Sequence, residues 1–269
     1  MFAAYAALSY LAPIQAGDFS ALWSFARLAH EHPAAQLYDP VWLHARQVEL
    51  GMNPDWDLPF HYPPLFLLIT WPLGLLPLRM AYHVWVGSTF AAFAWSLAGL
   101  RTGGMRVTWL LLLFVLVAPG TTVGVVFGQT SFLSGALLIG GMRLIGTRPL
   151  LGGLLLALLA YKPQFGLLVP VALLAARDFR GIAATAGMLA TLSGFAMMLF
   201  GRGIWLDWLL CLPNYVSTIV PLSSLLPLRA TVSANLAMFG TSETFATGTY
   251  AAVAALAAGL TWRVFKGGV

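Results

Sequence analysis

Long apolar runs separated by short basic turns dominate this sequence. The runs cover approximately residues 81–100, 107–127, 132–144, 181–200 and 246–264. Most approach the roughly 20 residues that an α-helix needs to cross the hydrocarbon core of a bilayer. With 59% hydrophobic residues, 9% charged residues and a mean hydropathy of +0.83, the chain lies far from soluble domains, of which roughly 25% is charged. The sequence therefore predicts an all-α, polytopic integral membrane protein.

Basic residues between the runs predict how the chain is oriented. Basic residues are enriched in cytoplasmic loops, so we expect these turns on the cytoplasmic side. The connections 13–60, 128–131, 161–164 and 201–245 then lie on the opposite side. The pI of about 9.7 therefore reflects topology, and no basic patch is clustered enough to indicate a nucleic-acid partner. The basic pairs are Arg101 with Arg106, Arg143 with Arg148, Arg177 with Arg180, and Arg263 with Lys266.

Residues 64–78 form a proline-interrupted stretch for which we expect only partial insertion. A full crossing would put the turn with Arg101 and Arg106 on the outer side, although Arg79 argues weakly for it. Broken backbone at membrane depth is tolerated only against protein or a wet cavity. The interrupting prolines are Pro63, Pro64, Pro72 and Pro77.

The run between Arg148 and Arg177 poses a similar question. A single span would separate the two arginines, whereas a hairpin turning at Lys162 and Pro163 keeps both inside. Each arm then has roughly a dozen residues, too few for a full crossing. A hairpin predicts an outer mouth that dips into the bilayer, as an enzyme acting on a lipid headgroup requires.

The first outer loop is predicted to hold interfacial helices. Asp18 can cap one amphipathic helix, and Asp39 can cap a second that ends at Gly51; both would lie flat on the membrane. Trp205 and Trp208 indicate a third interfacial helix, because indoles prefer the headgroup layer. Six of the nine acidic residues of the chain lie in the first outer loop, residues 13–60: Asp18, Glu31, Asp39, Glu49, Asp55 and Asp57.

Asp18 is the leading candidate for a catalytic base. An ionisable group at the rim of a bilayer is costly unless it has a partner or a role, and a carboxylate there can take a proton from a hydroxyl. The structural alternative is a helix N-cap, and the two roles are compatible.

Three further side chains could bind a substrate. Lys162, between two apolar arms, could pair with a lipid phosphate or could simply snorkel to the interface. Gln129 could hydrogen-bond a sugar or phosphate, or connect two helices. Tyr62 could stack on a sugar or anchor the chain at the interface. Arg27 and Arg46 are alternative phosphate contacts, or solvated side chains.

Several classes of function find no support in the sequence. Cys211 is the only cysteine, which excludes a disulfide within the chain. The histidines of the first loop match no metal signature, and no phosphate-cradling glycine loop, nucleophile elbow or zinc pattern is present. We therefore expect no cofactor, and no motif supports a divalent metal. An enzyme that uses a nucleotide is disfavoured for the same reason. These histidines are His30, His32, His44 and His61.

Short motifs follow one another along most of the chain. They are Gly17-Asp18-Phe19, Leu37-Tyr38-Asp39-Pro40, Tyr62-Pro63-Pro64-Leu65, Pro72-Leu73, Leu76-Pro77, Gly128-Gln129 and Lys162-Pro163-Gln164. In order and approximate spacing this series resembles glycosyltransferase family 87, although each motif is weak individually. Members of that family are polyprenyl-phosphate-mannose-dependent mannosyltransferases of the GT-C superfamily.

The resemblance implies an inverting single displacement. Asp18 would deprotonate an acceptor hydroxyl that attacks the anomeric carbon of a polyprenyl-phosphate hexose, with mannose as the expected sugar. The acceptor would be a lipid or a glycan. The active site would face the periplasm or cell exterior from a multi-pass protein of the plasma (inner) membrane. Substrate binding would involve Tyr38, Tyr62, Gln129, Lys162 and Gln164.

Residues 1–269 are expected to form a single GT-C-like transmembrane domain, with outer loops at 13–60 and 201–245. Two departures from the family pattern are a short first apolar run and a chain that stops soon after Lys266, so we expect a C-terminally truncated member. Two other functions stay open. A transporter or flippase for a lipid-linked substrate would also show broken helices, but no internal duplication is visible. A non-catalytic membrane assembly subunit is favoured if the truncation removes activity.

Overall fold

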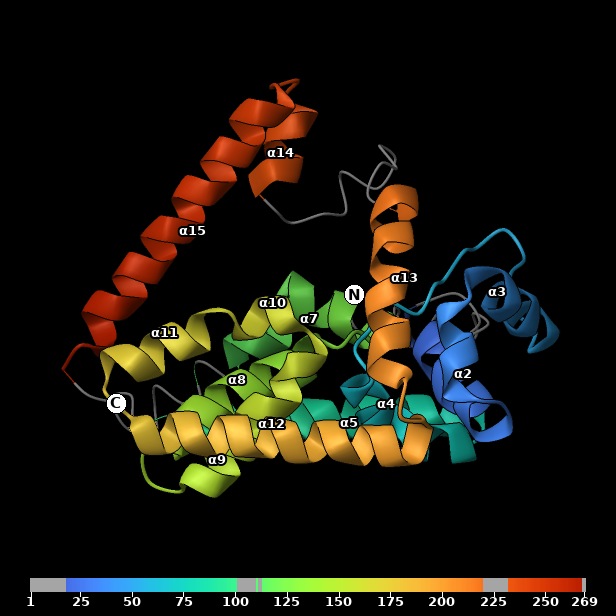
Figure 1. The fold of residues 1–269 in the computed structure, drawn as a ribbon, viewed down its shortest axis with the longest axis horizontal. Coiled ribbons are helices and arrows are strands. Elements are labelled where there is room, and N and C mark those ends of the chain that lie inside the picture. The colour runs from blue at the N-terminus through green and yellow to red at the C-terminus, as the bar shows by residue number, and fades with distance from the viewer. Residues whose placement is uncertain (1–17, 101–109, 111–112, 220–231, 268–269) are drawn as a thin grey trace.

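The computed structural model describes residues 18–100, 110, 113–219 and 232–267, and every regular element in these ranges is helical (Figure 1). The all-α prediction is therefore confirmed. The α-helices are α2 (Asp18–Glu31), α3 (Pro40–Glu49), α4 (Leu65–Thr70), α5 (Leu78–Ala98), α7 (Pro119–Val126), α8 (Ser131–Ile145), α9 (Pro149–Leu158), α10 (Pro163–Gly166), α11 (Leu168–Ala175), α12 (Phe179–Phe200), α13 (Ile204–Ile219), α14 (Val232–Met238) and α15 (Glu243–Phe265). Three short 3-10 helices are η1 (Ala34–Tyr38), η2 (Trp71–Leu75) and η3 (Leu159–Tyr161).

Two of the described helices are long and apolar enough to cross a membrane. They are α12 and, in α15, residues Thr244–Phe265, each of 22 residues and each with only 6% of its most apolar window buried inside the protein. Such apolar, outward-facing surface is what lipid contact requires. Helices α7 and α8 could supply a third, broken span, since they meet at an angle of 116°.

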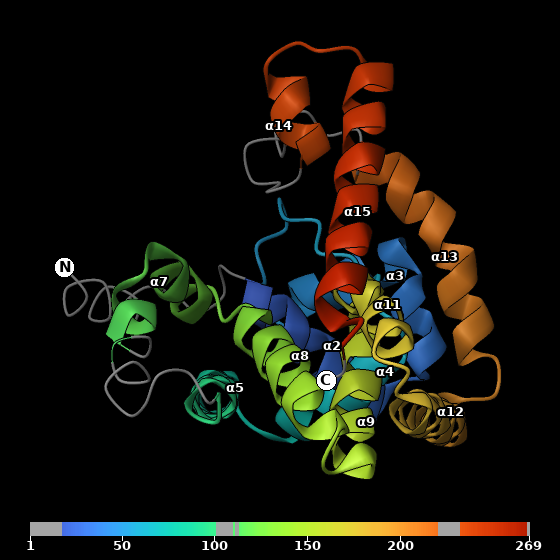
Figure 2. The ribbon, with the colours of Figure 1, turned by 90° about the vertical axis from the view of Figure 1, so that its left-hand side faces the viewer.

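Helices α5, α8, α9 and α12 pack side by side in that order. Figure 2 shows α5 and α12 end-on, so both run along the same axis, with α8 and α9 between them. Glycines bring these helices close together: a Cβ on Gly153 would lie 2.8 Å from the backbone of Ala184 in α12, and one on Gly152 would lie 2.6 Å from that of Ile145. Small residues at such contacts let membrane helices approach backbone to backbone.

The stretch between Arg148 and Arg177 folds as the expected hairpin. Its arms, α9 with η3 and α10 with α11, are separated by Lys162 and Pro163. The two arms lie together, because a buried apolar cluster joins α8, α9 and α11; its members are Ile145, Leu156, Val169 and Leu173.

The 64–78 stretch forms α4 and η2, of 6 and 5 residues, which are too short to cross a bilayer of roughly 30 Å. Helix α2 packs along this broken segment. The Trp23 indole donates to the Leu76 carbonyl at 2.9 Å, and the Arg27 guanidinium donates to the Gly74 carbonyl at 3.4 Å. Gly74 lies against Ala26, where a Cβ would come within 2.6 Å of backbone atoms. Protein groups thus satisfy carbonyls that the helix break leaves free.

The first-loop helices form where the sequence places them. The buried face of α2 includes Leu22, Phe25 and Leu28. The Asp39 carboxylate accepts hydrogen bonds from the first-turn amides of α3, and Gly51 ends that segment with a φ of 86°. Helix α13 runs across the end of α12 rather than along it, as Figures 1 and 2 show, which suits an interfacial helix.

Candidate functional site

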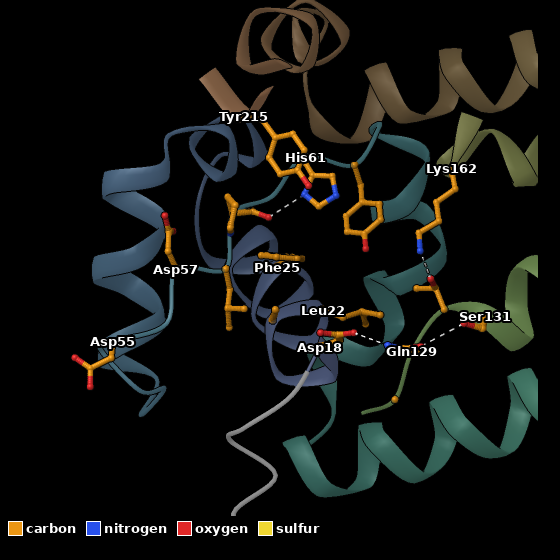
Figure 3. A pocket seen from close by; sticks show the side chains of 16 residues that line it. Asp18, Leu22, Phe25, Asp55, Asp57, His61, Gln129, Ser131, Lys162 and Tyr215 are labelled. Atoms are coloured by element: carbon orange, nitrogen blue, oxygen red, sulfur yellow. Dashed lines mark hydrogen bonds between the residues drawn. The ribbon is translucent and has the colours of Figure 1, made fainter. Parts of the chain in front are cut away.

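A cavity of about 680 Å³ opens where the start of α2, the loop after α3, the break between α7 and α8, the Lys162 turn and α13 meet (Figure 3). Its volume lies within the roughly 300–1,000 Å³ of small-molecule sites. The polar and aromatic residues on its wall are Asp18, Phe25, Asp55, Asp57, His61, Tyr62, Gln129, Thr130, Ser131, Lys162 and Tyr215.

Asp18 is the first residue of α2, and its exposed carboxylate lies on the cavity wall. The Gln129 amide nitrogen donates to Asp18 Oδ2 at 3.2 Å, and the Ser131 hydroxyl approaches the Gln129 amide oxygen at 3.5 Å. Figure 3 shows these three side chains in a row along one edge of the cavity. The amide of Gln129 therefore orients one carboxylate oxygen of Asp18 and leaves the other to a ligand.

The break between α7 and α8 is fixed against α2 and α5 by hydrogen bonds to its backbone carbonyls. The Phe19 amide donates to the Phe127 carbonyl at 3.0 Å, and the Trp85 indole donates to the Gly128 carbonyl at 2.9 Å. Gly128 has a φ of +60°, and a Cβ there would lie 2.6 Å from the Phe19 Cβ. Only glycine fits this close approach, which brings Gln129 to Asp18.

Lys162 enters the cavity from the turn between the hairpin arms. Its ammonium donates to the Thr130 hydroxyl at 2.6 Å and lies 5.8 Å from the Tyr62 ring centroid. Burial lowers the pKa of Lys162, and the negative charge of Asp18 partly opposes this effect. Among the described residues the ion pairs are Arg27 with Glu31 and Arg46 with Glu49, so no carboxylate contacts this ammonium. A partly buried cation without a contacting anion is suited to bind one.

Three aromatic rings stack along the wall above Asp18. The His61 ring lies between Tyr62 and Tyr215, with centroid distances of 4.5 and 4.1 Å. The backbone is held from both sides, because the Tyr38 hydroxyl donates to the Tyr62 carbonyl at 3.0 Å and the Trp208 indole donates to the His61 carbonyl at 3.1 Å. Burial lowers the pKa of His61 from 6.5 to about 4, so its imidazole is neutral at pH 7.

The structure brings four of the six site residues expected from the sequence to this one cavity. They are Asp18, Tyr62, Gln129 and Lys162. Tyr38 is buried behind the wall and supports Tyr62 through its hydroxyl, whereas Gln164 is an exposed residue of α10 and does not line the cavity.

The two arginines considered as phosphate contacts lie elsewhere. Arg27 pairs with Glu31 at 2.7 Å, and Arg46 pairs with Glu49 at 2.6 Å; neither arginine lines the cavity.

Sequence reasoning missed several residues of the wall. The sequence signal for Asp57 and His61 is their position just before Tyr62. Thr130 follows Gln129 and could have been found the same way. Tyr215 offered no local signal, because it reaches the cavity only through the packing of α13 against the loop. Within the described part of the chain, no group of three or more His, Cys, Asp or Glu side chains could hold a metal ion.

Fold and site together define a helical membrane protein whose cavity combines a carboxylate, an amide and an unpaired ammonium. The family model for glycosyltransferase family 87 matches residues 60–268, which is most of the chain. The protein therefore belongs to glycosyltransferase family 87 and is a membrane glycosyltransferase of GT-C type. The match includes Tyr62, Gln129 and Lys162, while Asp18 precedes it. Neither a curated protein nor a solved structure matches the chain.

Proposed function

We propose that the chain moves a hexose, with mannose as the first candidate, from a polyprenyl-phosphate donor to a lipid or glycan acceptor. The transfer takes place at the non-cytoplasmic face of the plasma (inner) membrane. The observation that carries this proposal is that one cavity is lined by both the Asp18 carboxylate and the Lys162 ammonium, which has no carboxylate partner among the described residues.

The chemistry is a single displacement. The acceptor hydroxyl oxygen forms a bond to the anomeric carbon while Asp18 takes the hydroxyl proton. The bond between that carbon and the phosphate oxygen breaks, and its electron pair leaves with the polyprenyl phosphate. Since the nucleophile enters opposite the leaving group, the configuration inverts.

Lys162 is suited to the leaving group. Its ammonium can neutralise the charge that develops on the phosphate oxygen, and the Thr130 hydroxyl fixes its direction. Gln129 is a positioning residue, because it orients Asp18 through one hydrogen bond. The rings of His61 and Phe66 stack on Tyr62, so Tyr62 can offer a sugar its hydroxyl rather than a ring face, and Tyr38 supports it from behind. Gln164 lies outside the cavity lining, so we assign it no contact in the transfer step.

The test uses the purified protein in lipid nanodiscs with polyprenyl-phosphate mannose, glucose or arabinose and a panel of glycan and lipid acceptors. We expect release of polyprenyl phosphate with at least one donor. Asp18→Asn should abolish release while retaining donor binding, and Glu49→Gln, which changes an exposed carboxylate away from the cavity, should not affect either.

Two results contradict the proposal. Donor movement across the bilayer without release of lipid phosphate would indicate a transporter. No release with any donor, together with an Asp18→Asn variant that supports its partner proteins as well as the wild type does, would indicate an assembly subunit.

A further inference from the structure

Tyr161 is a buried tyrosine beside the cavity that has no part in the transfer as described so far. It is the last residue of η3, it is 0% exposed, and it does not line the cavity. Its ring stacks on Phe66 with centroids 5.3 Å apart, which accounts for the ring but not for the hydroxyl. A buried hydroxyl costs folding free energy unless it finds a partner, so the partners of this hydroxyl indicate its role.

The Tyr161 hydroxyl belongs to a closed set of hydrogen bonds around the Thr130 carbonyl. It lies 2.7 Å from the Ser134 hydroxyl and 3.2 Å from the carbonyl oxygen of Thr130. The Ser134 hydroxyl lies 3.1 Å from the same carbonyl oxygen. One hydroxyl proton joins the two hydroxyls, and the other remains for the carbonyl, which can only accept. The two hydroxyls together therefore hold the backbone of Thr130 in place.

Thr130 uses its side chain differently from most threonines in its position. It is the N-cap residue of α8, where a threonine hydroxyl commonly accepts from an amide of the first helical turn. Within the described part of the chain this hydroxyl caps no amide, and it accepts instead from the Lys162 ammonium at 2.6 Å (a dashed line in Figure 3). The N-cap contact is thus given up for a contact to the cation of the cavity.

Tyr161 and Lys162 are consecutive residues, and both side chains contact Thr130. The tyrosine contacts its carbonyl, and the lysine contacts its hydroxyl. Because the Thr130 backbone is held, the hydroxyl has a fixed position from which it orients the ammonium. Such an orientation matters, since a misplacement of about 1 Å can lower the rate of a reaction by roughly 10²-fold.

We infer that Tyr161 is a positioning residue for the transfer: its hydroxyl fixes Thr130, which in turn sets the direction of the Lys162 ammonium. The inference rests on the proposed function, because it takes Lys162 as the group that faces the leaving phosphate. Tyr161 lies outside the cavity lining, so it contacts no substrate and acts through Thr130 and Lys162.

Tyr161→Phe tests the hydroxyl alone, since phenylalanine keeps the ring that stacks on Phe66. We expect kcat to fall about tenfold and the donor KM to stay within about twofold. An ammonium attracts a phosphate in many orientations, whereas stabilisation of the leaving oxygen requires a particular one.

Ser96→Ala is the matched control. It removes one buried hydroxyl, which donates to the Phe93 carbonyl at 2.7 Å, and the contact of the Ser96 carbonyl with Arg143 places it at the far end of α8 from Thr130. This variant should leave kcat and the donor KM unchanged, whatever its melting temperature.

Measuring Tyr161→Phe in a Lys162→Gln background separates positioning from a general structural role. If Tyr161 acts through the ammonium, its substitution should change kcat less than twofold once the ammonium is gone. The same tenfold loss in both backgrounds would overturn the inference. Ser134→Ala removes the other hydroxyl from the same carbonyl and is used for the same comparison if Tyr161→Phe yields too little folded protein.

A readout without turnover distinguishes failure of this inference from failure of the proposed function. Lys162 and Lys266 are the only lysines of the chain, so labelling of Lys162 by acetic anhydride can be quantified by mass spectrometry with Lys266 as the internal reference. The neutral amine is the reactive form, and the Thr130 hydroxyl stabilises the ammonium. Tyr161→Phe should therefore raise the relative labelling rate severalfold, and Ser96→Ala should not.

An unchanged labelling rate in Tyr161→Phe would overturn the positioning role. Absence of transfer by the wild type with every donor would overturn the proposed function, and the labelling rates would still show whether Tyr161 holds the lysine.

Discussion

Lys162 shows how a single residue can be unfavourable for folding and useful for binding. Burial disfavours its charge, since it lowers the pKa of Lys162, and within the described part of the chain the ammonium donates to the neutral hydroxyl of Thr130 and to no carboxylate. An ion held in this way costs folding free energy that an arriving anion can recover. A purely structural lysine would instead have a carboxylate partner or a fully solvated ammonium.

Replacing Lys162 should therefore separate function from stability. We expect Lys162→Gln to reduce kcat/KM for the donor by about 10²–10³-fold, as removal of a group that stabilises a developing oxyanion does. The thermal unfolding midpoint should stay level or rise, because a desolvated charge is removed. Donor kinetics and a melting curve on the same preparation check both expectations. A lower melting temperature with unchanged donor kinetics would mean that the ammonium has a structural role.

His61 should make stability depend on pH. Its pKa is lowered by burial to about 4 in the folded chain, against an ordinary 6.5. Between these values the unfolded chain binds more protons than the folded one. The contribution of His61 to the free energy of unfolding is therefore fully present above pH 6.5 and is lost as the pH drops toward 4. The loss should approach about 3 kcal/mol, from 1.36 kcal/mol per pKa unit.

The measurement compares melting temperatures of the wild type and His61→Phe across this range. Carboxylates titrate in both proteins, so the difference between the two curves isolates His61. The wild type should lose more stability than the variant between pH 6.5 and 4. Parallel curves would show that folding does not lower the pKa of His61.

At the scale of single elements, the break between α7 and α8 determines whether Gln129 meets Asp18. Its geometry depends on Gly128, which combines a positive φ with contact to Phe19. Gly128→Ala should destabilise the protein by roughly 1–3 kcal/mol, the usual cost of overpacking, and should also reduce transfer because the Asp18 contact is displaced. Gly187→Ala in α12 is the control, since a Cβ there meets nothing within 4 Å. Full activity in Gly128→Ala would show that the break tolerates a shift.

The sequence predicted those elements whose signals are local. Asp39 and Gly51 mark the ends of α3, and Lys162 with Pro163 marks the hairpin turn, because caps, glycines and prolines act within a few residues. The position of Tyr215 depends on how α13 crosses the loop at His61. The hydrogen bond between Trp208 and His61, which fixes this crossing, joins residues 147 positions apart in the sequence. Such a contact is decided by packing of the whole chain, which no local pattern encodes.

For the molecule as a whole, the structure brings basic turns to one end, as the charge pattern predicted. Gly99, at the end of α5, lies against the Arg143 side chain, and Gly181, just after Arg180, lies against Ile145. Arg101 and Arg106 themselves lie outside the described residues. The cavity lies at the other end of α8, where Gln129 and Ser131 precede the helix and Arg143 closes it. One end of the bundle is therefore basic, and the other carries the site.

This polarity predicts which parts of the chain are reachable from each side of the membrane. In a Cys211→Ser background, a cysteine at Asn53 reports the site end and a cysteine at Arg148 reports the basic end; both positions are exposed. Since basic turns stay in the cytoplasm, an impermeant maleimide applied to intact spheroplasts should label position 53 and reach position 148 only after permeabilisation. The reverse pattern would put Asp18 on the cytoplasmic side, where the proposed donor and acceptor would have to be presented instead. Labelling of both positions from outside would contradict a cytoplasmic location of the Arg148 end of the hairpin. Helices α9 and α11 would then need a different orientation in the membrane.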